Sequence, residues 1–238
     1  MTRSHLAIRP RPNQIAELTR GLRLPLPEIE EEYLKIIAES LYKAFYNLKS
    51  RYPAILAEEE DEITAFLETE LNNMVSEDEI WRTLVSNVTR GRECLSFDGS
   101  HLKKEPDLSI YLTGLLPNFP LVVEAKLIDV ATSKTETLYC DNGIMRFVKG
   151  EYAWGNREAF MIAYVRDNSS ISTKLAPFLD AKMNQSPPGY SVTSQVEKKG
   201  DGTIDLAMSQ HGRRFNYIGR SPPEDQPGAI SVWHLWLV

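Results

Sequence analysis

Cysteine, histidine and long apolar runs are scarce in this sequence. Its two cysteines, Cys94 and Cys140, have no metal-type spacing, which argues against a disulfide framework and a cysteine-based zinc site. No stretch of about 18 uncharged apolar residues occurs, so no transmembrane helix is predicted. Residues 1–14 contain no apolar core of signal-peptide length, and we therefore expect a cytoplasmic protein.

Signatures of several common enzyme classes are also missing. Neither a Walker-type phosphate loop nor a G-x-S-x-G nucleophile elbow occurs. The four histidines are scattered without ligand spacing, and His234, which alternates with tryptophans, is interpreted as a packing residue. These absences leave carboxylate and lysine side chains as the main candidates for chemistry.

The charge balance is acidic. Asp and Glu total 33 against 27 Lys and Arg, which gives a net charge of −6 and argues against a histone-like nucleic-acid coat. A phosphodiesterase stays possible, because a metal-dependent enzyme can place carboxylates beside a basic stripe. The 238 residues, 42% apolar, suit one globular domain with appendages.

Hydrophobic periodicity predicts an α/β chain. A helical period of 3.6 dominates up to about residue 85, and a strand period of 2 begins near residue 92. Helices are predicted at 28–50, 58–75, after 79, 135–154 and 169–183, and strands at 93–97, 107–112, 119–128, 159–165, 190–195, 203–208 and 229–238. Three consecutive strands followed by helix and strand favour a mixed sheet with helices on both faces.

Three segments are expected within one domain. Residues 1–57 form an arginine-rich arm and a first helix, 58–184 form the core, and 185–238 add strands that complete the sheet. The arm is interpreted as a solvated surface segment, with contact to phosphates as the alternative.

Two charged residues interrupt the apolar strand predicted at 119–128. Glu124 and Lys126 are two positions apart, so they project from the same face of a strand. Pro106-Asp107 begins the preceding strand, and a hairpin between the strands would bring Asp107 beside Glu124. Converging carboxylates favour a hard cation such as Mg²⁺ or Mn²⁺, and a neighbouring lysine can orient water or stabilise negative charge.

This pattern is weak when taken alone. Acidic-x-Lys also occurs at Asp180-Ala-Lys182 and Glu197-Lys-Lys199, although only Glu124-Ala-Lys126 lies in an apolar strand. The alternative interpretation is a buried Glu–Lys ion pair on a sheet, with Asp107 capping a turn.

Pro106, Asp107, Glu124 and Lys126 resemble the motif of the PD-(D/E)XK nuclease superfamily, which has the restriction-endonuclease-like fold. The resemblance covers about residues 58–166 and implies a three-layer α/β/α core. It implies Mg²⁺, with Mn²⁺ as a substitute, bound by Asp107, Glu124 and the backbone carbonyl of Ala125. It also implies that Lys126 positions the water that attacks the phosphodiester.

The resemblance extends to the flanking helices. The superfamily often places an acidic residue on the helix before the sheet, and Glu62 is the expected counterpart and an additional metal ligand or helper; Glu58 and Glu70 are weaker candidates. A polar residue on the helix after the Glu-x-Lys strand often faces the site, which makes Arg146 and Lys149 candidates.

Basic residues near the predicted hairpin are candidates for contacts with a nucleic-acid backbone. They are Arg90, Arg92, Lys103 and Lys104, with Arg213, Arg214 and Arg220 nearer the C-terminus. Trp81, Tyr139 and Trp154 are candidates for stacking on bases, with core packing as the default interpretation.

The resemblance favours a DNA-cleaving enzyme, and an endonuclease in particular. It suggests a prokaryotic restriction or anti-phage defence effector that acts as a homodimer or with a protein partner supplying specificity or activation. The alternative is a non-catalytic nucleic-acid-binding or assembly subunit on the same fold.

Overall fold

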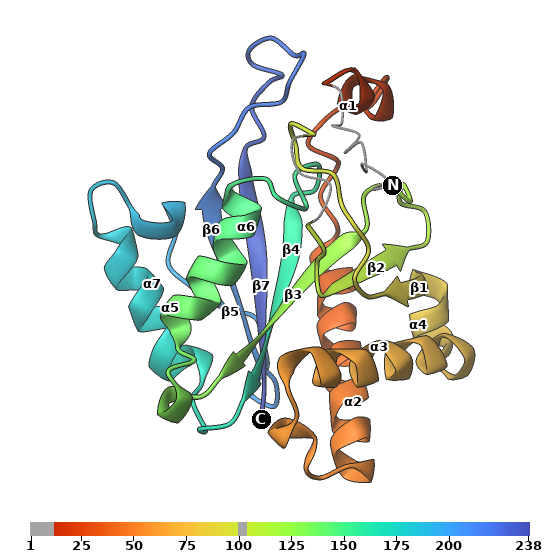
Figure 1. Cartoon of the computed structure of the whole chain (residues 1–238), viewed down its shortest axis with the longest axis vertical. Helices are drawn as coiled ribbons and strands as arrows, with labels where there is room; N and C mark the ends of the chain where they lie inside the picture. Colours follow the sequence, from red (N-terminus) through yellow and green to blue (C-terminus); the bar gives the residue numbers. More distant parts are fainter. Residues whose placement is uncertain (1–11, 100–103) are drawn as a thin grey trace, which may run out of the picture.

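The computed structural model describes residues 12–99 and 104–238, which form a seven-stranded mixed sheet in the order β1-β2-β3-β4-β7-β6-β5 (Figure 1). The strands β3, β4 and β7 are parallel, and the flanking pairs are antiparallel. The strands are β1 (Val85–Thr89), β2 (Leu108–Leu112), β3 (Leu121–Ile128), β4 (Glu158–Val165), β5 (Glu197–Lys198), β6 (Asp205–Gly212) and β7 (Ala229–Leu237).

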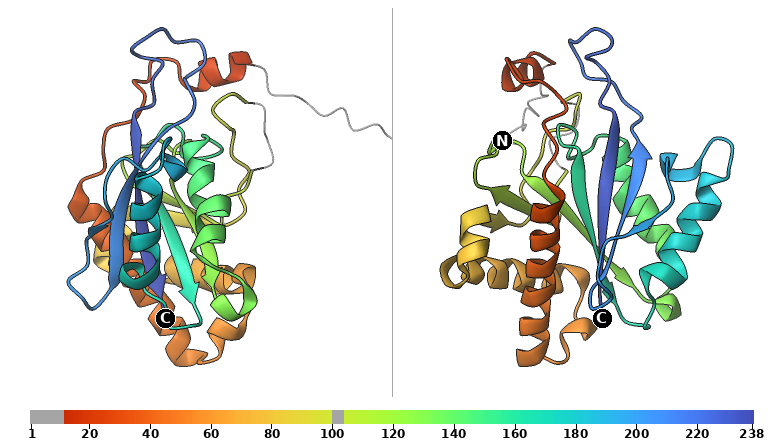
Figure 2. Two further views of the ribbon diagram at one scale, coloured as in Figure 1. Left: turned by 90° about the vertical axis from the view of Figure 1, so that its left-hand side faces the viewer. Right: turned by 180° about the vertical axis from the view of Figure 1, so that it is seen from behind.

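Helices cover both faces of this sheet, as the sequence predicted (Figure 2). Helices α2, α3 and α4 pack on one face, and α5, α6 and α7 pack on the other. The helices are α1 (Pro12–Leu18), α2 (Glu31–Arg51), α3 (Glu60–Glu77), α4 (Glu79–Leu84), α5 (Glu136–Tyr139), α6 (Met145–Val148) and α7 (Ala176–Met183). Among the described residues, none of these helices has the length and apolarity to cross a membrane.

Alternation along β3 builds two separate cores. Leu121, Val123, Ala125 and Leu127 pack against α2 and α3, whereas Val122 faces α5 and α6. Residues two apart on a strand share a face. The side chains of residues 124 and 126 therefore leave β3 on the side of α5 and α6, inside an otherwise apolar layer.

The first helices follow their apolar stripes. Leu34, Ile37, Leu41 and Phe45 are buried along α2, at the spacing that predicted this helix. The helix α4 begins at Glu79, where the sequence predicted a short helix. Its N-cap is Asp78, whose carboxylate accepts hydrogen bonds from the backbone N–H groups of the first turn.

The strand predicted at 93–97 is wrong. The edge strand is β1, where Val85 and Val88 are buried, and residues 92–97 form a loop with a single bridge between Cys94 and Lys104. The Asn72 side chain on α3 accepts a hydrogen bond from the Val88 N–H at 3.0 Å and donates to its carbonyl at 2.8 Å. This long-range clamp stabilises β1 as the edge strand. Hydrophobic periodicity does not predict it, because the two residues belong to different elements.

The helix predicted at 135–154 is interrupted. Between α5 and α6 the chain forms a π-helical turn, η3 (Cys140–Ile144), and the helix ends at Val148. The helix predicted at 169–183 is likewise divided into a π-helical turn, η4 (Ile171–Leu175), and α7. A π turn adds a residue to the helical repeat, so the faces that follow are rotated.

The arm before α2 is not simply solvated. Ile15 and Leu24 are buried in a third apolar cluster together with Phe119, Trp154 and Phe215. This cluster ties the segment from Pro12 onward to a loop beside β3 and to the loop between β6 and β7. Residues 1–11, which contain Arg3, Arg9 and Arg11, lie outside the described residues.

Candidate active site

The candidate site forms where β3 continues past the end of β2. In the ladder Leu108 pairs with Val123, and the next position of the same register places Asp107 opposite Glu124, as the predicted hairpin required. Beyond this point β3 has no strand neighbour on the β2 side among the described residues. The backbone N–H of Ala125 instead donates to Asp107 Oδ2 at 2.7 Å.

A second carboxylate completes this edge. Glu60, in the first turn of α3, accepts a hydrogen bond from the Leu127 N–H through Oε2 at 2.8 Å. Asp107 and Glu60 thus replace the carbonyl groups that β2 would present to β3 if it were longer. This arrangement keeps two carboxylates against the strand, because buried backbone N–H groups need acceptors.

The Lys126 ammonium lies at the centre of the cluster. Its Nζ is 2.8 Å from Glu124 Oε1, 3.1 Å from Glu60 Oε1 and 3.4 Å from Asp107 Oδ2. It also donates to the carbonyl of Ala125. In this structure one cation therefore faces the oxygen atoms of both motif carboxylates and the backbone carbonyl between Glu124 and Lys126.

Burial shifts the protonation of the central pair. Burial raises the pKa of the Glu124 carboxyl to about 7, and the nearby Asp107 carboxylate adds to the increase. Burial by itself would lower the pKa of Lys126, but Glu124, Asp107 and Glu60 together raise it above its ordinary value. Lys126 is consequently a permanent cation that donates hydrogen bonds at neutral pH, not a proton acceptor.

Arg146 provides a second positive charge. Its Nη1 lies 3.2 Å from Glu124 Oε1, and the guanidinium also donates to the Tyr152 hydroxyl. The η3 turn brings this residue close, since Gly143 packs directly on β4. A Cβ on Gly143 would lie 2.2 Å from Met161 Cε and 3.7 Å from Glu124 Cγ. A larger residue at position 143 would therefore require the Met161 side chain to move away from this turn.

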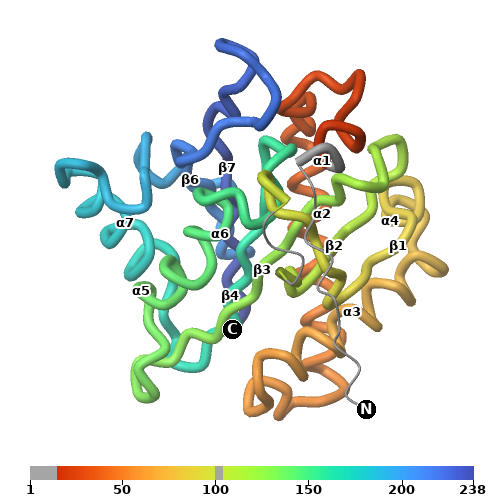
Figure 3. The backbone as a smooth tube through the Cα atoms, turned by 45° about the horizontal axis from the view of Figure 1, so that its top comes forward, coloured from red at the N-terminus to blue at the C-terminus, as the bar shows by residue number. Residues whose placement is uncertain are grey.

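These side chains line an open cleft of about 510 Å³. In Figures 1 and 3, β3 passes between α6 on one side and α3 on the other. The lining is strongly polar and includes Glu60, Asp61, Thr64, Arg90, Glu105, Asp107, Glu124, Lys126 and Arg146. Such a cleft suits a charged, extended substrate better than an apolar small molecule.

The donor set fits a hard divalent cation. Asp107, Glu124 and the carbonyl of Ala125 supply oxygen ligands of the kind that Mg²⁺ prefers. Glu124 Oε2 is buried and has no hydrogen-bond partner among the described residues, which leaves an acceptor for a cation. Within residues 12–99 and 104–238, no three Asp, Glu, His or Cys side chains come close enough to hold a metal by themselves.

Of the acidic residues in the first turn of α3, Glu60 and Asp61 line the cleft, whereas Glu62 does not. Glu62 lies outside the cleft and accepts a hydrogen bond from the Glu59 N–H at 3.4 Å, as part of the helix cap. Glu58 contacts Tyr52, and Glu70 contacts Arg51. Sequence reasoning missed Glu60, although it lies one helical turn before the buried Thr64 and on the same helix face.

The predicted nucleic-acid contacts divide into two groups. Arg90 lines the cleft, and Arg92 stacks on Tyr111, with its Cζ 5.3 Å from the ring centre. Lys104 instead forms an ion pair with Glu151 at 2.9 Å, and Lys149 is exposed but does not line the cleft. Lys103 lies outside the described residues.

The C-terminal arginines donate hydrogen bonds within the protein, Arg214 to Ser191 Oγ at 2.7 Å and Arg220 to the carbonyl of Leu22 at 2.8 Å. The half-buried Arg213 guanidinium donates to the carbonyl of Trp154 at 2.7 Å, and loss of solvation lowers its pKa to about 10. Trp81 and Tyr139 are fully buried core residues. His234 is buried as well, as the sequence predicted.

Comparison with known protein families, curated proteins and solved structures finds no match to the chain.

Proposed function

We propose that this protein is a metal-dependent nuclease that hydrolyses phosphodiester bonds, with DNA as the favoured substrate. The observation that carries the proposal is the convergence of Asp107, Glu124, the Ala125 carbonyl and Lys126 in one open, polar cleft. Arg90 and Arg146 line the same cleft and supply positive charge for a phosphate backbone.

The order of elements supports a restriction-endonuclease-like core. Helices α3 and α4 are followed by the antiparallel strands β1, β2 and β3, by the interrupted helix α5–η3–α6, and by β4 parallel to β3. This is the helix–three-strand–helix–strand order that the sequence resemblance implied, with β1 in place of the strand expected at 93–97.

Mg²⁺, when bound, would polarise the scissile phosphate and make a bound water a better nucleophile. Asp107 and Glu124 would hold the ion together with the Ala125 carbonyl. Lys126 would orient the attacking water by donating a hydrogen bond and would stabilise the negative charge that develops on the phosphate. Glu60 would fix the position of the ammonium, and Arg146 would hold the Glu124 carboxylate in its ionised form.

A second candidate function rests on the completeness of the ion cluster. Lys126 already satisfies three carboxylates and a carbonyl, so the same residues can serve as a structural ion network in a non-catalytic binding or assembly subunit. The two functions differ in whether a divalent cation competes with the ammonium for Asp107 and Glu124.

The decisive experiment measures cleavage of supercoiled plasmid, linear duplex and single-stranded DNA and RNA with Mg²⁺, Mn²⁺ or EDTA. Asp107→Ala and Lys126→Ala should each reduce cleavage at least about a thousandfold, because each removes a group needed in the transition state. Asp180→Ala and Lys182→Ala, in the other acidic-x-Lys motif on α7, are matched controls and should retain wild-type activity.

Calorimetry separates the two functions if no strand is cut. Mg²⁺ or Mn²⁺ binding that disappears in Asp107→Ala, but persists in Asp180→Ala, would indicate a nuclease that awaits a partner protein. Absence of metal binding by the wild type would contradict the nuclease proposal and favour the structural ion network.

A further inference from the structure

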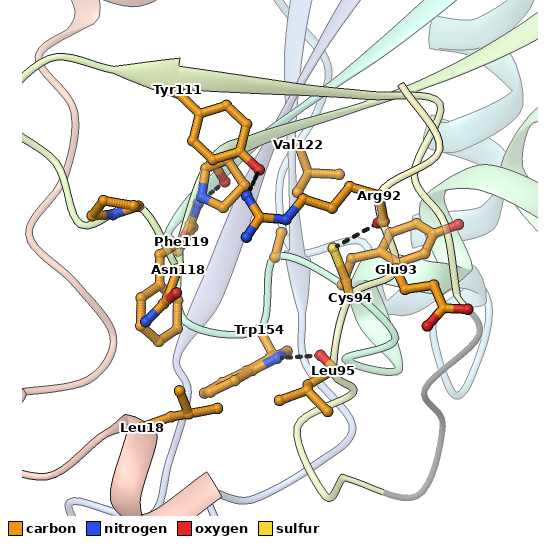
Figure 4. Close-up of a pocket in the computed structure, with 15 residues that line it drawn as sticks. Leu18, Arg92, Glu93, Cys94, Leu95, Tyr111, Asn118, Phe119, Val122 and Trp154 are labelled. Atoms are coloured by element: carbon orange, nitrogen blue, oxygen red, sulfur yellow. Dashed lines mark hydrogen bonds between the residues drawn. The ribbon is translucent and has the colours of Figure 1, made fainter. Parts of the chain in front are cut away.

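A second cavity lies beside the candidate active site. It encloses about 200 Å³ beneath the edge of the sheet, between β2, the loop 92–95 and the loop 152–156 (Figure 4). Aromatic rings dominate its walls, with Tyr111, Phe119, Tyr152 and Trp154 among the lining residues. Arg92 and Cys94 supply polar atoms from the opposite loop.

Two direct links join this cavity to the cleft. Val122 lines the cavity and Glu124 lines the cleft, and these residues lie two positions apart on the same face of β3, a separation of about 6.6 Å. In addition, the Tyr152 hydroxyl at the cavity wall accepts a hydrogen bond from Arg146, which contacts Glu124. The cavity and the cleft are therefore adjacent along β3.

The cavity walls are already held in place. The Trp154 indole N–H donates to the carbonyl of Leu95 at 2.7 Å, and the Arg92 guanidinium donates to the Tyr111 hydroxyl while stacking on its ring. Figure 4 shows Tyr111 and Trp154 at opposite ends of the cavity, with the Arg92 guanidinium between them and the Glu93 carboxylate turned outward. A ligand that binds here contacts preformed planar surfaces, so little side-chain entropy is lost on binding.

Size and chemistry together select the ligand class. At about 200 Å³ the cavity is smaller than the 300–1,000 Å³ of typical drug-sized sites, so it accepts one small planar group. Aromatic faces and an arginine plane are the surfaces on which single unstacked bases are held. We propose that this cavity takes up one base of the strand whose phosphate lies in the cleft, an inference that rests on the proposed nuclease function.

The test compares two strands that differ only in their bases. Oligothymidylate and an all-abasic phosphodiester strand of equal length are titrated against the full-length protein in EDTA, where no cleavage occurs. Stacking of a base in the cavity predicts that the wild type binds oligothymidylate about 5- to 150-fold more tightly than the abasic strand. Contacts to phosphate alone would bind both strands equally.

Two variants test whether the preference for oligothymidylate over the abasic strand arises in this cavity. Arg92→Ala removes the guanidinium plane, and Cys94→Phe fills the cavity from the loop; each should bring the ratio of the two affinities close to one. Arg82→Ala, an exposed arginine on α4 that lines neither cavity, loses the same charge and should keep the wild-type ratio. Circular dichroism of each variant establishes that it is folded.

A wild-type ratio near one, or a ratio that survives in both cavity variants, would overturn the base pocket. If metal-dependent plasmid cleavage persists in that case, the nuclease proposal stands and only the pocket is lost. Failure to bind either strand together with absence of cleavage would overturn both. If the base preference is observed, duplex DNA containing 2-aminopurine tests whether the base can come from a duplex. The protein extrudes a base if 2-aminopurine fluorescence changes with the wild type and does not change with the two cavity variants.

Discussion

Lys126 determines the charge state of the candidate site. Its ammonium faces Glu124, Asp107 and Glu60, and these three carboxylates offset the cost of burying the cation. Glu60 makes a second contribution, since its other oxygen accepts the hydrogen bond of the Leu127 N–H. One side chain on α3 thus positions both the lysine and the strand that carries it.

The neighbouring glutamates Glu60 and Glu62 provide a matched pair for testing this role. Glu60→Gln should reduce metal-dependent cleavage about 10- to 100-fold, because the ammonium loses one of its charged partners. Glu62→Gln, half a helical turn away, should cleave within about twofold of the wild type. Steady-state cleavage rates of the two variants are the measurement, and equal losses in both would contradict the assignment of Glu60.

The η3 turn is the element that shapes the site from the other side. It brings Gly143 against Met161 on β4 and carries Arg146 toward Glu124. A regular helix over the same residues would present a different face after residue 144, because a π turn changes the angular position of each following side chain. The η3 turn therefore directs Arg146 into the site.

Gly143→Ala should destabilise the protein by about 1–3 kcal/mol, since the new methyl group overlaps Met161 in a packed core. Urea denaturation followed by circular dichroism measures the effect. Asn142→Ala, at an exposed position of the same turn, should change the free energy of unfolding by less than about 0.5 kcal/mol. Shortening Met161 to alanine in the Gly143→Ala background should recover part of the loss, and purely additive effects would contradict the overlap.

A buried chain of hydrogen bonds connects distant parts of the whole molecule. Tyr139 on α5 lies 3.0 Å from His234 Nδ1 on β7, and His234 Nε2 lies 2.7 Å from Ser209 Oγ on β6. Ser209 Oγ is 2.7 Å from His211 Nε2, and His211 Nδ1 is 2.9 Å from the carbonyl of Tyr190. Both histidines can be neutral in this chain, with His211 donating to the Tyr190 carbonyl and accepting from Ser209, and His234 donating to Ser209 and accepting from Tyr139.

Stability should therefore fall in acid. Burial lowers the pKa of His211 to about 4 and that of His234 well below its ordinary value, whereas both bind protons near pH 6.5 in the unfolded chain. The unfolded state takes up more protons as the pH falls from 6.5 toward 4, so each histidine contributes a slope of about 1.4 kcal/mol per pH unit. Full stability is present above this range.

Denaturation curves from pH 4 to 8 measure the slope. His211→Gln keeps a hydrogen-bonding side chain without a titrating ring. Between pH 4 and 6.5, its free energy of unfolding should change less steeply with pH than that of the wild type, by about 1.4 kcal/mol per pH unit, which corresponds to one proton. Carboxyl groups titrate equally in both proteins, so the difference isolates the histidine. Identical slopes would show that His211 does not titrate differently on folding.

Features that depend on nearby residues could be predicted from the amino-acid sequence. The stripe from Leu34 to Phe45 defined α2, and the apolar run around Glu124 and Lys126 marked β3 and showed that two charges lie inside it. The spacing from Asp107 to Glu124 was enough to predict the hairpin, because strand register follows from alternation and loop length.

Other features depend on contacts between elements that are distant in sequence. The hydrogen bonds of Asn72 hold Val85–Thr89 as the edge strand. The orientation of α3 against the open edge of β3 brings Glu60, and not Glu62, into contact with β3. The π turn between α5 and α6 places Gly143 against Met161 on β4. Periodicity reports which face of an element is buried, but the partner of a polar side chain is set by elements that are distant in sequence.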